Sequence, residues 1–187
     1  IQNKTVFLKG GKDKKTGLYA AATAGHTGDQ SDTGYNNTWV RDNMLLAHTL
    51  YTLDPEGPGA DEAVQCVDSV AAFFLKSLSK FQDIIDGTAD KNDPMMRPHV
   101  RFDGPKMEEC PEFWNHKQND ALAYFVWMRC RMGVDKKIPD TEAHLKLLAL
   151  IIDYFKAIEY WQDEDSGCWE ETPKVEASSI GAVLASI

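Results

Sequence analysis

Helical segments of two kinds alternate along this chain. The helices predicted at about 59–81 and 140–161 place their apolar residues at steps of three and four, in one narrow stripe each. The helix predicted at about 117–132 has a centre, ALAYFVWM, that is apolar on every side, and those predicted at about 42–53 and from about 175 are short or apolar all round. A one-sided helix lies at a surface, whereas an all-round apolar helix must be enclosed.

This strict alternation predicts inner and outer helices in concentric rings, an all-α fold of the α/α toroid type. A plain up-down bundle is the competing architecture, but it does not require alternate helices to be enclosed. It also does not require the loop before residue 117, which is far longer than the ~4–6 residues of most connections and is rich in aromatic and charged residues. Because the last helix ends within an apolar pattern, we expect residues 1–187 to be the N-terminal part of a single, incomplete domain.

Local signals suggest where some elements begin and end. Gly133 is placed as a C-terminal helix cap, and Asp140 or Thr141 as the N-terminal cap of the next helix. A short hairpin is expected near the N-terminus, with the chain turning at Gly10-Gly11.

Composition excludes several classes of partner. The formal net charge of -9 and the pI of about 5.0 argue against nucleic acid or an anionic membrane. No apolar run approaches the ~20 residues of a membrane-spanning helix. The four cysteines form no C-x-x-C pair and the five histidines lack ligand spacing, so neither a metal site nor a cofactor is predicted. Cysteine usage does not demand an oxidising compartment, which slightly favours a cytoplasmic over a secreted location.

Three clusters rich in tryptophan, arginine and carboxylates precede the helices predicted to be enclosed. Their sequences are YNNTWVRDN, RPHVRFDGP and CWEE. If the inner helices of a toroid run parallel, their N-terminal ends share one rim, where the clusters would converge. Indole faces stack on the C–H face of a sugar, and charged groups bind its hydroxyls, so a carbohydrate site is predicted. Its candidate residues are Trp39, Arg41, Asp42, Arg101, Asp103, Trp169, Glu170 and Glu171.

The adjacent carboxylates of Glu170 and Glu171 indicate acid chemistry. An apolar neighbour such as an indole disfavours the ionised form of a carboxyl group, and a second carboxylate adds to this effect. Glycoside hydrolysis needs one protonated carboxyl group as acid and a second carboxylate as base or nucleophile. Adjacent side chains point in different directions, so one glutamate is expected to be the acid and the other to bind a hydroxyl or tune the first.

Each candidate also has a purely structural explanation. Asp42 could cap the first helix, and the tryptophans could be core aromatics. The two glutamates could be a solvated pair favoured by the helix dipole, and Asp103 could belong to an ordinary turn. A helical scaffold without a sugar site would place the clusters on opposite faces. The order of the three clusters before alternate helices favours the sugar site.

At these clusters the sequence resembles glycoside hydrolase family 15 and its relatives, which include glucoamylases and the glucoamylase-like part of phosphorylase kinase α and β subunits. TWVRDN resembles the family's Trp-x-Arg-Asp segment, and CWEE its Trp-Glu-Glu segment. RFDGP resembles its Arg-Asp-Gly-Pro segment with Phe102 as an extra residue. The resemblance covers roughly residues 16–187 and looks closest to the kinase-subunit branch.

The resemblance implies an (α/α)6 barrel and inverting exo-hydrolysis of α-glucosidic bonds in an α-glucan or maltooligosaccharide, with no cofactor. Glu170 matches the general acid, and Arg41 and Asp42 match residues that hold the terminal glucose. The surroundings of that glucose are matched by Trp39, Arg101, Trp169 and Glu171. The catalytic base belongs to the other half of the barrel, which is the implied partner. Likeness to the kinase-subunit branch leaves a non-catalytic, glucan-binding regulatory module as the alternative.

Overall fold

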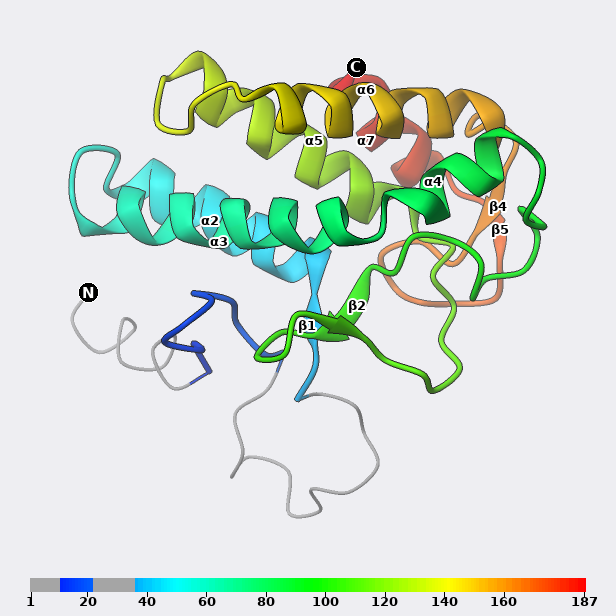
Figure 1. The fold of residues 1–187 in the computed structure, drawn as a ribbon, viewed down its shortest axis with the longest axis horizontal. Coiled ribbons are helices and arrows are strands. Elements are labelled where there is room, and N and C mark those ends of the chain that lie inside the picture. Colours follow the sequence, from blue (N-terminus) through cyan, green and yellow to red (C-terminus); the bar gives the residue numbers. More distant parts are fainter. Residues whose placement is uncertain (1–10, 22–35) are drawn as a thin grey trace.

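The computed structural model describes residues 11–21 and 36–187, and this part of the chain is mostly helical (Figure 1). Its helices are α2 (Val40–Leu53), α3 (Pro58–Lys76), α4 (Leu78–Ile85), α5 (Asn119–Val134), α6 (Glu142–Ala157) and α7 (Ala177–Ser186). Its strands are β1 (Thr38–Trp39), β2 (Arg101–Asp103), β3 (Glu108–Glu109), β4 (Glu164–Asp165) and β5 (Lys174–Val175). The prediction of an all-α class is therefore confirmed. None of the helices in the described ranges has the length and hydropathy needed to span a membrane.

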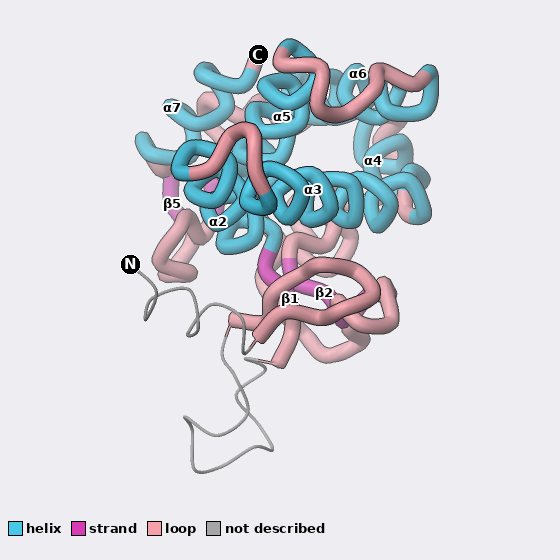
Figure 2. Tube along the Cα trace, turned by 90° about the vertical axis from the view of Figure 1, so that its left-hand side faces the viewer, coloured by secondary structure: helices cyan, strands magenta, loops and turns pink. Residues whose placement is uncertain are grey.

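The helices form two layers. α2, α5 and α7 pack in one layer, with α5 contacting the other two, while α3, α4 and α6 form the second layer against them. Figure 2 shows α7 and α2 on one side and α6 and α4 on the other. The first layer holds the helices predicted to be inner and the second those predicted to be outer. Two such layers fit a segment of two concentric rings, and closure into a toroid stays a prediction.

The inner helices differ in how far this chain encloses them. Ten of the 16 residues of α5 are buried, as its all-round apolar centre predicts. α7 buries only Ser179 and Val183. Leu184 and Ile187, the residue after α7, are 59% and 60% exposed. The reason is that α7 packs on α5 and has no helix on its other side within the described residues. The remaining half of the barrel stays the predicted cover for this face.

The outer helix predicted at about 59–81 is in fact two helices that meet at Ser77. The backbone of Ser77 leaves the helical region (φ -118°, ψ 31°), and the Ser77 hydroxyl donates to the carbonyl oxygen of Phe73 at 3.4 Å. A serine side chain that bonds to the backbone competes with regular helix geometry. The change of direction carries Phe81 of α4 into the core, against Phe74 and Tyr154.

Short strands fasten the long loop to the start of α2. β1 pairs antiparallel with β2, which places Trp39 opposite Arg101, and β2 pairs with β3 in a hairpin. Phe102 points into the core and stacks on Phe73 with ring centroids 3.8 Å apart. A Cβ at Gly104 would overlap with the Thr38 side chain, so glycine allows the hairpin to lie this close to β1.

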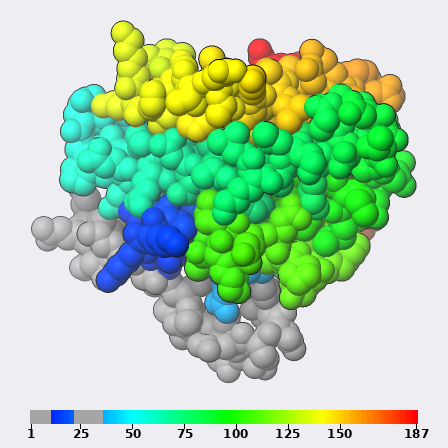
Figure 3. Space-filling view, viewed as in Figure 1, coloured from blue at the N-terminus to red at the C-terminus, as the bar shows by residue number. Residues whose placement is uncertain are grey.

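The segment 11–21 lies beneath α3, as its colour shows in Figure 3. Lys12 and Tyr19 form an antiparallel bridge around a turn in which the Asp13 carboxylate accepts from the Thr16 amide at 2.7 Å. Gly17 takes a positive φ of 72° there. The hairpin therefore turns farther along the chain than predicted, because Asp13 and Gly17 supply its turn chemistry; Gly10 lies outside the described residues.

Candidate active site

Glu170 lies in the turn between β4 and β5 and contacts the first cluster through Trp39. Its Oε1 accepts from the indole Nε1 of Trp39 at 2.8 Å and from the amide Nε2 of Gln118 at 3.1 Å. Both donors are buried, whereas the Glu170 side chain is exposed. Its φ of 55° is a conformation that a non-glycine residue rarely adopts. The turn and two donors thus fix one carboxylate oxygen and leave the group open to solvent.

Arg41 of α2 joins three parts of this site. Its Nε and Nη2 donate to the Asp120 carboxylate at 2.6 and 2.9 Å, which is a buried bidentate ion pair. Nη2 also donates to Gln118 Oε1 at 2.8 Å and to the carbonyl oxygen of Gly167 at 3.1 Å. Burial alone would lower the pKa of Arg41, but the Asp120 hydrogen bond and charge raise it overall. The guanidinium therefore ties α2 to α5 and to the Glu170 turn.

Asp42 presents a solvent-accessible carboxylate to the same region. The N-cap of α2 is Trp39, with no side-chain cap, and no hydrogen bond to the Asp42 carboxylate occurs among the described residues. Its pKa is raised, first by partial burial and also by the negative charges of Glu170 and Asp120, while Arg41 opposes the shift. Asp42 is thus an accessible acceptor close to Glu170 and not a cap.

Arg101 supports Trp39 from β2. It is buried, and its guanidinium carbon lies 4.2 Å from the ring centroid of Trp114 and 5.7 Å from that of Trp39. The two indoles meet edge to face at 5.8 Å. A guanidinium over indole faces is a favourable cation–π arrangement, so Arg101 stabilises the position of Trp39.

Three other candidates lie outside the hydrogen bonds that hold Glu170. Asp103 accepts from the backbone and side-chain nitrogens of Lys106 at 3.0 and 2.8 Å, in the β2–β3 turn. Burial alone would raise the pKa of Asp103, but the Lys106 bonds hold it below its ordinary value. Trp169 is 82% exposed, and Glu171 accepts from Lys174 at 3.0 Å. In the described part of the chain no hydrogen bond links these three side chains to the Glu170 carboxylate.

Two residues that hold the site together were not predicted. Gln118 and Asp120 stand at the N-terminal end of α5, in HKQND, directly before the apolar run ALAYFVWM. The rule that picked out the other clusters, polar residues just before an enclosed helix, applies equally to them. No group of three metal-ligating side chains occurs in residues 11–21 and 36–187.

The sequence matches the glycosyl hydrolases of family 15 over residues 3–186. The chain belongs to glycosyl hydrolase family 15. This confirms the family resemblance, and the match covers nearly the whole chain.

The chain is also similar to the uncharacterized lipoprotein YgeQ of Escherichia coli (strain K12). The two are 24% identical over an alignment 150 positions long, which covers 73% of this chain and 56% of that protein. The family 15 chain thus spans little more than half the length of this relative.

Proposed function

We propose that the protein containing this chain is an inverting exo-hydrolase of α-glucosidic bonds, in which Glu170 is the general acid. The hydrogen bond from Trp39 to Glu170 carries the proposal, because it joins two segments that are 131 residues apart and that both resemble parts of the family 15 site. Family membership supports the reaction class.

The geometry suits an acid that must give up a proton. Oε1 of Glu170 is held by Trp39 and Gln118, so Oε2 is the oxygen that would protonate the glycosidic oxygen. As the bond to the leaving group breaks, Glu170 becomes a carboxylate, which the two N–H donors stabilise. A base in the remaining half of the barrel would activate water on the opposite face of the sugar, and the product would have inverted configuration.

The other candidates divide into binding and supporting roles. Asp42, an accessible acceptor close to Glu170, would bind hydroxyls of the terminal glucose. Trp169 and Glu171 are exposed beside the acid and would contact the sugar that leaves. Arg41 and Arg101 are already engaged by Asp120 and by indoles, so their part is to hold the turn and Trp39. Asp103 would serve the hairpin.

The test is to incubate the full-length protein with maltooligosaccharides and to follow the anomer of released glucose. Release of β-glucose that falls ~100-fold or more in Glu170→Gln would support the proposal. Lys106→Gln, a surface substitution in the β2–β3 turn, serves as the control and should leave the rate near that of the wild type. Saturable binding without release, weakened by Asp42→Ala, would support the regulatory module instead. Neither release nor binding would overturn the sugar site.

A further inference from the structure

We propose that Asp165 is a positioning residue for Glu170: its buried carboxylate fixes the turn that presents the acid. The inference rests on the proposed function for its effect on turnover, while the effect on the turn can be measured without any activity. Neither the family match nor the sequence motifs assign a role to this residue.

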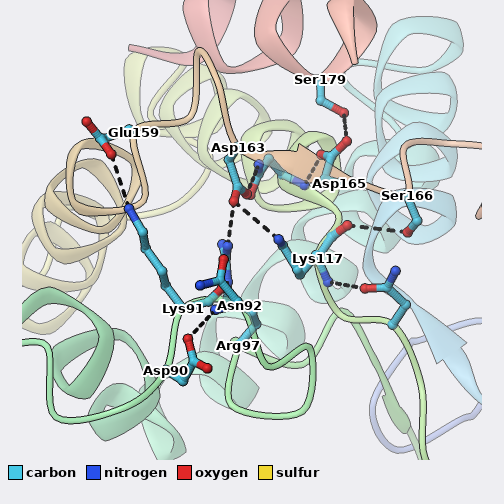
Figure 4. Close-up of polar contacts among 12 residues, drawn as sticks. Asp90, Lys91, Asn92, Arg97, Lys117, Glu159, Asp163, Asp165, Ser166 and Ser179 are labelled. Atoms are coloured by element: carbon cyan, nitrogen blue, oxygen red, sulfur yellow. Dashed lines mark hydrogen bonds and ion pairs between the residues drawn. The ribbon is translucent and has the colours of Figure 1, made fainter. Parts of the chain in front are cut away.

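Asp165 joins the first turns of two inner helices. Its side chain is 0% exposed. Oδ2 accepts from the backbone amide of Asn119 in α5 at 2.9 Å, and Oδ1 accepts from the hydroxyl of Ser179 in α7 at 3.1 Å. Figure 4 shows Asp165 between Ser179 and the loop that carries Lys117. A carboxylate near helix N-termini is also favoured by their dipoles.

A short series of backbone bonds connects this carboxylate to Glu170. The next residue, Ser166, donates its amide and hydroxyl to the carbonyl oxygen of Lys117 at 2.9 and 3.3 Å. Its own carbonyl oxygen accepts from the Glu171 amide at 3.0 Å, and that of Gly167 accepts from the Glu170 amide at 3.3 Å. Movement of Asp165 away from α5 and α7 would therefore displace the turn and its acid.

The charges around Asp165 show that it is not one half of an ion pair. Arg97 and Lys117 contact Asp163 instead, at 2.7 and 3.5 Å (Figure 4). Asp120 faces it from α5, and the residue that faces it from α7 is the uncharged Ser179. Burial raises the pKa of Asp165 to about 6; the Asn119 and Ser179 bonds oppose this rise, and the charges of Asp120 and Asp163 add to it.

Asparagine and alanine at position 165 separate positioning from charge. Asp165→Asn can still accept from the Asn119 amide, and its side-chain N–H can donate to the Ser179 hydroxyl. Asp165→Ala loses both bonds and leaves a buried amide without its acceptor. If Asp165 only stabilised the fold, the alanine variant would melt earlier but would keep the turnover number at temperatures where it is folded.

The experiment measures turnover and hydrogen exchange on the full-length protein. We expect kcat for maltotetraose to fall ~10- to 100-fold in Asp165→Ala, with KM changed less than about threefold, because small displacements of a catalytic group have effects of this size. Asp165→Asn should restore most of the loss. Amides in residues 166–171 should exchange faster in the alanine variant than in the wild type. Glu164→Ala, the exposed neighbour in β4, is the matched control and should change neither quantity.

The outcomes keep the two proposals distinct. Unchanged exchange of residues 166–171 in Asp165→Ala would overturn the positioning role, and so would unchanged kcat in an active protein. If the wild type has no turnover, the exchange measurement still decides the matter. Should Asp165→Ala fail to fold, Ser179→Ala removes one of the two bonds and should produce a smaller change in the same direction.

Discussion

The indole Nε1 of Trp39 donates a 2.8 Å hydrogen bond to Oε1 of Glu170. Trp39 precedes the first inner helix, and Glu170 precedes the third. Gln118, which precedes the second, donates to the same oxygen. The segments that precede α2, α5 and α7 therefore meet at one carboxylate, so the site depends on how these three segments are held together.

Removal of the indole donor should affect turnover more than folding. Trp39→Phe keeps most of the ring but deletes the N–H, and we expect kcat to fall ~10-fold, with a loss of about 1 kcal/mol in the free energy of unfolding. Trp114→Phe is the matched control, because the buried Nε1 of Trp114 has no hydrogen-bond partner within the described residues. Steady-state kinetics and denaturant unfolding would measure both, and equal losses of kcat in the two variants would contradict the expectation.

Loss of the Arg41–Asp120 pair should be costly to stability. Arg41→Met leaves the Asp120 carboxylate buried without its partner, which typically costs 3–5 kcal/mol, and the Gly167 carbonyl also loses a donor. Lys146→Met breaks the exposed Lys146–Glu142 pair of α6 and should change stability by no more than ~0.5 kcal/mol. Urea titrations of both variants would test the contrast; similar midpoints would refute it.

Much of the helical layout could be predicted from periodicity, because burial imposes it on the sequence. The stripe of α3 and the all-round apolar centre of α5 appear as predicted. In α6 the predicted stripe is displaced, because Leu145 is 51% exposed and the buried residues include Leu147, Ile151 and Tyr154. The break at Ser77 could not be foreseen in this way, since Phe81 continues the stripe of α3 and only the contacts of Phe81 with Tyr154 show the change of direction.

The sequence predicts a residue of the candidate site only where its position just before an inner helix indicates what it will contact. Trp39 and Glu170 lie where convergence at one rim would put them. The Asp120 partner of Arg41 could not be read from spacing, because an ion pair across 79 residues leaves no local pattern. Trp169 was predicted to be the indole beside the acid, but its side chain is exposed. The indole that contacts the Glu170 carboxylate belongs to Trp39.

The backbone conformation at position 170 should suit glycine better than a residue with a Cβ, although glycine would remove the acid. Its φ of 55° strains any residue with a Cβ by roughly 1 kcal/mol. We therefore expect Glu170→Gly to be more stable than Glu170→Ala by about 0.5–1 kcal/mol, since both delete the carboxylate and only the first removes the Cβ. Thermal unfolding of the pair would measure the difference. Both should lack turnover, and greater stability of the alanine variant would argue against a strained turn.

The raised pKa of Asp165 predicts a specific pH dependence of stability. Because its folded pKa of about 6 lies above the ordinary 3.8, the folded state binds a proton more tightly than the unfolded state. The contribution of Asp165 to the free energy of unfolding is complete below about pH 4 and is lost as pH rises through 6. The total loss is roughly 3 kcal/mol. Asp165→Asn should therefore gain stability relative to the wild type between pH 4 and 7. A difference that stays constant across this range, as we expect for Glu164→Gln, would contradict it.

The C-terminal end of α5 is not capped by Gly133, contrary to the prediction from the sequence. Its observed cap offers a stabilising substitution. The helix continues to Val134, and Lys136 takes the positive φ of 57° instead. The amide of Lys136 donates to the carbonyl oxygen of Gly133, and that of Lys137 to the carbonyl oxygen of Met132, at 3.0 and 2.9 Å, which is the Schellman pattern.

Lys136→Gly should therefore raise the free energy of unfolding by about 0.5–1 kcal/mol, because glycine adopts this conformation without the Cβ penalty and only part of that gain is offset by the greater entropy of the unfolded chain. Lys136→Ala is the control: it removes the same charge and side chain but keeps the Cβ, and should change stability little. Chemical denaturation of the two variants side by side makes the test, and equal stabilities would show that the left-handed residue carries no strain.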